Sequence, residues 1–160
     1  MRTPMNAVNC FGYVFILTLV GCSSSDWKAK TFQVTGTVSI NGESPVGLVV
    51  SLVSVGSPVD SRASRPWGIV QEDGHYKLTT YDSQSDGAPA GRYAVTLFWP
   101  KNIHGDPTDR LYGIHRSSKK PVAEFVIDEK TTTLPPIVLT KVKVMPVMPN
   151  EDQRLTPGQS

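Results

Sequence analysis

Cysteine is almost absent from this sequence, whose 160 residues contain only two, Cys10 and Cys22. Two cysteines cannot form the cluster of thiolates that usually holds a structural zinc ion. The sequence also contains no Gly-x-Ser-x-Gly elbow, no His-Glu-x-x-His pair and no phosphate-binding loop. These absences favour a protein that is not an enzyme and that needs neither a metal nor a cofactor.

An excess of charge of one sign is lacking as well. Sixteen Lys and Arg face fourteen Asp and Glu, so the formal net charge is +2. Proteins that bind nucleic acid usually concentrate basic residues on one face and have a high pI. We therefore expect no nucleic-acid partner.

The third absence is an apolar run long enough to span a bilayer, which needs about 20 residues. The run from Phe11 to Val20 is shorter and is interrupted by Gly12 and Thr18. It follows Arg2 and has the size of the apolar region of a signal peptide. An ordinary secretory signal and an uncleaved anchor are the alternatives at this point.

The end of this run, Leu19-Val20-Gly21-Cys22, resembles the lipobox of bacterial lipoproteins. The resemblance implies cleavage between Gly21 and Cys22, removal of residues 1–21 and lipidation of Cys22. It implies a membrane partner through that anchor, and a location in the cell envelope, at the outer membrane or periplasmic face rather than in the cytoplasm. Loss of Cys10 with the signal and capping of Cys22 would leave no cysteine for a disulfide.

The rest of the chain divides by composition into a tether at residues 22–31, a β domain at 32–145 and a disordered tail at 146–160. Ser23-Ser24-Ser25 favours a flexible tether. Apolar and polar residues alternate from Phe32 to Ile40, which indicates a half-buried strand. The run Val46–Val55 is apolar at both alternating sets of positions, which predicts a strand covered on two faces. Residues 100–121 show no period and predict a surface excursion.

About seven such short strands, separated by Gly- and Pro-rich turns, predict an all-β antiparallel sandwich. Its expected core positions are Val38, Val50, Leu78, Val95 and Leu97. The rings of Tyr76 and Tyr93 are expected between the sheets, with their hydroxyls on polar partners.

Several segments together resemble the transthyretin-like (prealbumin-like) carboxypeptidase regulatory-like domains of small bacterial lipoproteins, notably those of planctomycetes. The resemblance covers residues 32–140 and rests on Val34-Thr35-Gly36-Thr37-Val38, Glu72-Asp73-Gly74-His75-Tyr76, Asp86-Gly87-Ala88-Pro89-Ala90-Gly91-Arg92-Tyr93, Asp109-Arg110-Leu111-Tyr112-Gly113 and Leu134-Pro135-Pro136-Ile137. It implies a sandwich with Greek-key connections. The same fold carries 5-hydroxyisourate hydrolase, but the C-terminal Tyr-Arg-Gly-Ser of that enzyme is missing here.

The loop from Lys101 to Pro121 is the candidate binding site, because loops on a rigid sheet often carry recognition. Its candidate residues are His104, Asp106, Asp109, Arg110, Tyr112, His115 and Arg116. The spacing of its histidines and carboxylates matches no established metal site, and a loop with no partner is the alternative interpretation. Trp67, Phe98 and Trp99 are either an aromatic face or ordinary core residues.

These observations predict a membrane-anchored, non-enzymatic envelope lipoprotein with a structural or protein-interaction role. A carbohydrate or small-ligand binding module and an enzyme of unknown type are the alternatives. The partner is expected to be an envelope protein or a glycan.

Overall fold

A computed structural model describes residues 26–82, 85–102 and 105–147 of the chain, and these residues form strands and turns with no helix. The predicted all-β class is confirmed. The strands are β1 (Thr31–Phe32), β2 (Thr35–Ile40), β3 (Val49–Ser54), β4 (Trp67–Ile69), β5 (His75–Lys77), β6 (Ala88–Pro89), β7 (Gly91–Phe98), β8 (Ala123–Ile127) and β9 (Ile137–Leu139).

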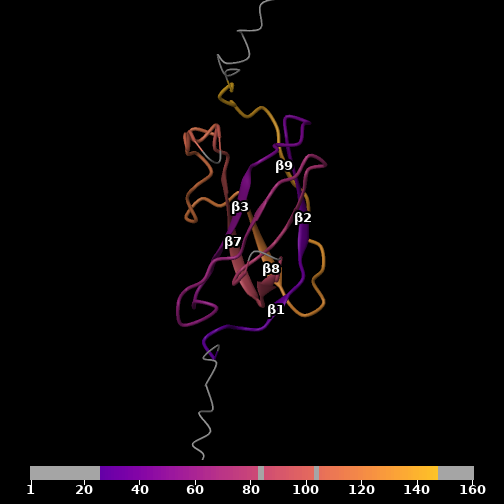
Figure 1. Cartoon of the computed structure of the whole chain (residues 1–160), viewed down its shortest axis with the longest axis vertical. Helices are drawn as coiled ribbons and strands as arrows, with labels where there is room; N and C mark the ends of the chain where they lie inside the picture. Colours follow the sequence, from indigo (N-terminus) through magenta and orange to yellow (C-terminus); the bar gives the residue numbers. More distant parts are fainter. Residues whose placement is uncertain (1–25, 83–84, 103–104, 148–160) are drawn as a thin grey trace, which may run out of the picture.

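Two sheets face each other across the core, consistent with a sandwich (Figure 1). One has the strand order β5-β2-β9 and the other β4-β3-β7-β8, while β1 and β6 form a small separate pair. The described residues form nine strands, whereas about seven were predicted, partly because β1 and β6 have only two residues each and leave no periodic signal.

One pair of strands departs from the predicted antiparallel arrangement. β9 runs parallel to β2, with Val38 opposite Ile137 and Ile40 opposite Leu139. The physical reason lies in the segment after β8, which crosses to the other sheet where β2 begins. There the amide of Thr35 donates to the carbonyl of Thr132 at 3.0 Å. A chain that arrives at the start of β2 and continues along it is necessarily parallel to it.

The core follows from the alternation along β2. Its inward side chains, Val38 and Ile40, are 2% and 3% exposed, and the strand ends in a tight turn with positive φ at Asn41 and Gly42. Asn-Gly is the dipeptide that such turns favour. All five predicted core positions are buried, as is a wider set comprising Val34, Leu48, Leu52, Val70, Leu111, Ile127, Leu134 and Ile137.

Tyr76 and Tyr93 are both buried between the sheets, but only Tyr93 has the polar partner predicted for its hydroxyl. Tyr93 Oη donates to the carbonyl of Pro89 at 2.8 Å. Tyr76 Oη is buried without a hydrogen-bond partner among the described residues. Its ring occupies a slot between Gly36 and Gly68, where a Cβ on Gly36 would overlap the hydroxyl. The prediction of a polar partner for Tyr76 was therefore wrong: its ring lies against Gly36, and no described donor or acceptor reaches its hydroxyl.

The two-sided burial expected for Val46–Val55 is found in a different strand. β3 buries Val50 and Leu52 but leaves Val49 and Val53 half-buried, and Val46 is 51% exposed. β7 is the strand that buries consecutive residues on both faces, from Tyr93 to Leu97. β7 pairs with β3 on one edge and with β8 on the other, so it is one of the two inner strands of its sheet.

Packing extends beyond the predicted N-terminal limit of the β domain at residue 32. Trp27 meets Tyr81 edge to face, with ring centres 5.4 Å apart, and the amide of Ala29 donates to Tyr81 Oη at 2.9 Å. The N-terminal part of the sandwich therefore includes residues before 32. At the other limit, the amide of Met145 donates to the carbonyl of Arg110 at 2.8 Å.

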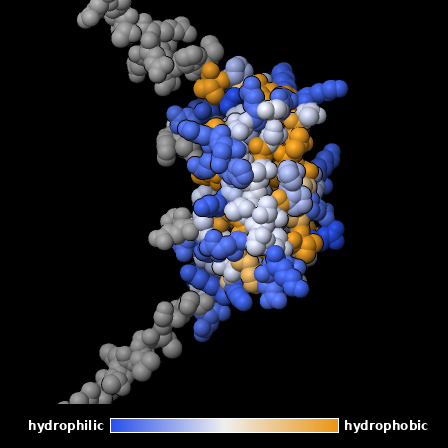
Figure 2. Space-filling view, turned by 90° about the vertical axis from the view of Figure 1, so that its right-hand side faces the viewer, coloured by the Kyte–Doolittle hydropathy of each residue, from blue (hydrophilic) through white to orange (hydrophobic). Residues whose placement is uncertain are grey.

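The described chain contains no helix with the length and hydropathy needed to cross a bilayer. The surface over β2 and β9 carries hydrophilic residues with scattered hydrophobic ones (Figure 2). Its outward side chains on β2 are Thr35, Thr37 and Ser39, all half-buried.

Candidate functional site

The predicted binding loop lies at the end of the sandwich opposite the N-terminal segment (Figure 1). Gly21, Cys22 and His104 fall outside the described residues, so the signal and lipidation site and one loop histidine stay predictions. The other candidate residues lie in a loop that is more ordered than a surface excursion. Turns run from Arg110 to His115, and Leu111 is fully buried in the core.

Asp109 is the reason for this order. Its Oδ1 accepts hydrogen bonds from the amides of Trp99 and Leu111, both at 3.1 Å, and its Oδ2 accepts one from Gly113 at 3.0 Å. The residue is only 9% exposed. Its carboxylate satisfies backbone donors that would otherwise be buried without partners. Asp109 therefore builds the loop, and its carboxylate faces the loop's own backbone.

Arg110 joins three segments of the chain at this end. Its guanidinium stacks 3.8 Å from the centre of the Trp99 ring, and its Nε donates to the carbonyl of Met145 at 3.0 Å. Trp99 in turn donates from Nε1 to the carbonyl of Val46 at 3.0 Å. Burial lowers the pKa of Arg110, but arginine remains charged at neutral pH. Arg110 and Trp99 thus form the framework of this end.

The remaining candidates point outward or act locally. Tyr112 is 45% exposed, with Lys143 Nζ 5.2 Å from its ring centre. Asp106 is exposed and lies 3.4 Å from Lys101 Nζ. Hydrogen bonds from Thr108, together with the charge of Lys101, lower the pKa of Asp106. His115 contributes its carbonyl, which accepts from the amide of Leu97 at 2.8 Å.

These titratable groups do not converge on one point. Among the described residues, no three or more His, Cys, Asp or Glu side chains lie close enough together to hold a metal ion. Instead, the loop end of the sandwich has exposed apolar side chains held on ordered turns. Its large exposed residues, each between 45% and 63% exposed, are Val46, Tyr112, Ile114 and Val147.

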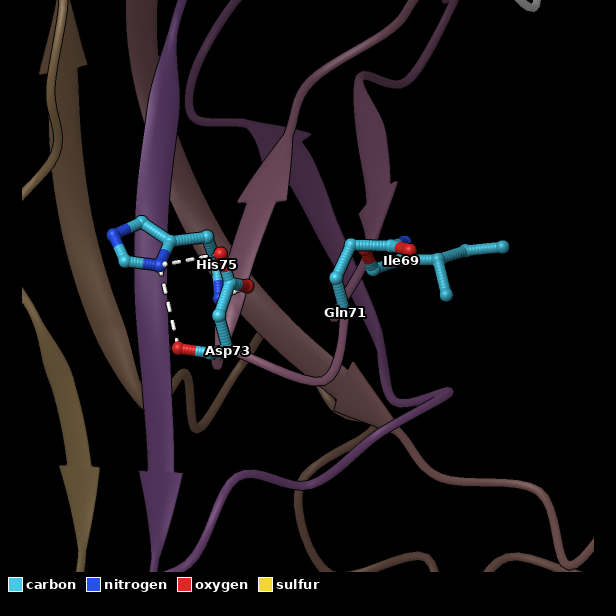
Figure 3. A network of polar contacts seen from close by, with 4 residues as sticks. All are labelled: Ile69, Gln71, Asp73 and His75. Atoms are coloured by element: carbon cyan, nitrogen blue, oxygen red, sulfur yellow. Dashed lines mark hydrogen bonds and ion pairs between the residues drawn. The ribbon is translucent and has the colours of Figure 1, made fainter.

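A hollow of about 430 Å³ lies on the outer side of the β4–β5 hairpin. Trp67, 40% exposed, lines it together with polar residues from the hairpin. In the turn, Asp73 Oδ1 accepts from the amide of His75 at 3.0 Å and Oδ2 lies 3.3 Å from His75 Nδ1 (Figure 3). Gln71 Nε2 donates to the carbonyl of Ile69 at 3.0 Å. The hairpin therefore presents an aromatic ring beside donors and acceptors.

Sequence reasoning missed this hollow because its parts are unremarkable one by one. From the sequence, His75 is expected to be an ordinary exposed hairpin residue. Trp67, Phe98 and Trp99 are expected to form either one aromatic face or part of the core. The structure separates that set. Phe98 lines a different hollow, and Trp99 is covered by Arg110. The turn between β4 and β5, together with the bridge between Trp67 and Thr79, brings the lining together.

Comparisons with protein-family models, curated proteins and solved structures found no match.

The transthyretin-like topology and its Greek-key connections therefore remain predictions from the resemblance.

Proposed function

We propose that this protein is a lipid-anchored, non-enzymatic envelope lipoprotein whose β-sandwich is a protein-interaction module. The observation that carries the proposal is the sequence Leu19-Val20-Gly21-Cys22 at the end of a short apolar run. The geometry of the domain supports it in one further respect. The N-terminal segment and the loop end lie at opposite ends of the molecule (Figure 1).

The N-terminal segment is held firmly where it joins the sandwich. Trp27 packs on Tyr81, and the guanidinium of Arg62 lies 3.8 Å from the centre of the Trp27 ring. Five residue steps from Cys22 to Trp27 reach at most about 18 Å. An anchor at Cys22 would therefore keep this end near the bilayer and direct Tyr112 and Ile114 away from it.

Lipidation is tested by replacing the proposed acceptor. We expect Cys22→Ala to block processing and leave a precursor without labelled fatty acid, because acylation requires the thiol. Ser23→Ala is the matched control, since it should be processed and labelled normally. Electrophoresis after labelling with radioactive palmitate measures both. Normal cleavage and labelling of Cys22→Ala would show that the anchor is elsewhere.

The interaction surface is tested by photo-crosslinking in cells. A photoreactive amino acid at Ile114 should trap a defined envelope protein, because Ile114 is 63% exposed at the loop end. The same amino acid at Lys130, exposed in the connection between β8 and β9, is the control. Equal products from the two positions, or none from Ile114, would contradict an interaction site at the loop end.

A carbohydrate-binding role is the second candidate, and the hollow beside Trp67 favours it. Sugars combine apolar C–H faces with hydroxyls, so an exposed indole flanked by Gln71, Asp73, His75 and Lys77 suits them. The full chain should bind a neutral oligosaccharide on a glycan array, and Trp67→Ala should abolish that binding. Phe98→Ala, outside this hollow, is the control. Binding that survives Trp67→Ala would remove this candidate.

A further inference from the structure

A second hollow lies on the outer face of the four-stranded sheet and has a different chemical character. Its volume is about 290 Å³, and it lies over β3 and β7. Two arginines line it, Arg65 from the segment before β4 and Arg116 from the loop after β7. No Asp or Glu is among its lining residues.

Neither arginine has a carboxylate partner in the described part of the chain. The ion pairs found there join Asp73 to His75, Arg92 to Glu124 and Lys101 to Asp106. Arg116 is oriented by stacking, with its guanidinium 4.6 Å from the centre of the Phe98 ring. Two positive groups at one hollow repel each other, and a bound anion would relieve that repulsion.

The remaining lining strengthens the preference for an anion. Ser51, Thr96 and Ser118 bring hydroxyl groups, while Val49 and Val53 bring apolar surface. Apolar surroundings lower the effective dielectric constant and strengthen interactions between charges. Guanidinium groups bind phosphate oxygens through two parallel hydrogen bonds, a geometry that lysine cannot match.

We propose that this hollow binds a phosphate group, with Arg65 and Arg116 as its two cationic ligands. Its volume equals that of about ten water molecules, so a phosphate with a small organic substituent fits. Either a soluble phosphomonoester or the head group of an anionic phospholipid supplies this chemistry. The proposal does not depend on the loop end or on lipidation of Cys22.

The test uses the full chain in non-ionic detergent and follows its backbone amides by NMR. Titration with inorganic phosphate and with glycerol 3-phosphate should give saturable shifts at Ser118, with dissociation constants of about 1–10 mM. Arg65→Gln with Arg116→Gln should weaken binding at least about tenfold. The matched control, Lys119→Gln with Lys120→Gln, removes the same charge from outside the hollow and should bind as the parent does.

Doping the detergent micelles with phosphatidylglycerol distinguishes the source of the phosphate. Saturable shifts at Ser118 with the lipid alone identify a head-group site, and shifts with glycerol 3-phosphate identify a soluble ligand. In both cases the double arginine variant should lose the shifts while keeping the parent's circular dichroism. The proposal is overturned if no probe gives saturable shifts, or if the arginine and lysine variants respond alike.

Discussion

At the scale of single residues, the hydroxyls of the two buried tyrosines differ in their hydrogen bonding. Tyr93 Oη donates to Pro89, whereas Tyr76 Oη is buried without a partner in the described structure. Tyr93→Phe should lower the free energy of unfolding by about 1 kcal/mol, because it leaves a buried carbonyl unpaired. Tyr76→Phe should leave that free energy unchanged or raise it. Urea unfolding measures both variants, and an equal loss in the two would contradict the assignment.

Asp109 is the residue on which the loop end depends most. Replacing it with Ala removes the acceptor of three backbone amides, those of Trp99, Leu111 and Gly113. We expect the free energy of unfolding to fall by about 2–4 kcal/mol. Glu129→Ala, at an exposed position near the other end, should change it by less than about 0.5 kcal/mol. Similar losses for the two variants in urea unfolding would contradict the role given to Asp109.

The sequence predicted the buried residues well. It was a poorer guide to which side chains are available to bind a partner. Val38, Val50 and Leu97 are buried as expected, because alternation along a strand reports the face directly. Asp109 was predicted as a binding residue, since its sequence context is that of a polar loop. Its three amide partners come from two segments, and only the folded chain brings them together.

At the scale of elements, the segment Thr79–Tyr81 after β5 is held by the carboxylate of Asp86, which makes stability depend on pH. Asp86 Oδ1 accepts from Thr79 Oγ1 and from the amide of Thr80, both at 2.7 Å, and Oδ2 accepts from the amide of Tyr81 at 3.0 Å. Partial burial raises the pKa of Asp86, but these hydrogen bonds outweigh it and lower the pKa below its usual value.

A carboxyl group whose pKa is lowered by folding stabilises the folded state above the pKa of the unfolded chain, about 4. That stabilisation is lost as the pH falls through the lower pKa of the folded state. Asp86→Asn should therefore reduce the free energy of unfolding at pH 7 by about 1–3 kcal/mol and by less at pH 2. Urea unfolding at the two pH values tests this. The same loss at both would assign the effect to packing rather than charge.

The sequence predicted the long strand with an alternating pattern, but it predicted neither the two-residue strands nor which strands are neighbours. β2 carries enough alternating residues to show its period, and its buried and half-buried positions alternate accordingly. β1 and β6 have two residues each, and they exist because Thr31 and Phe32 lie opposite Pro89 and Ala88. Strand direction was also beyond reach for β9, since a sequence pattern shows which face is buried but not which neighbour pairs with it.

At the scale of the whole molecule, the described residues are held together by apolar burial and contain no disulfide. No cysteine occurs among the described residues, and the core joins both sheets in one cluster. The midpoint of thermal unfolding should therefore be the same with and without a reducing agent, and far-ultraviolet circular dichroism should be dominated by β structure. A midpoint that falls on reduction would reveal a disulfide through Cys10 or Cys22.

The parallel pairing of β2 with β9 also has a consequence for the order in which the chain can fold. The side chain of Asn41 and the backbone of Val142, 101 residues apart, exchange hydrogen bonds beside this pair. Contacts between such distant residues slow folding, because a large loop must close before they form. β2 can pair with β5 early, but it lacks its second neighbour until the chain has been synthesised as far as β9.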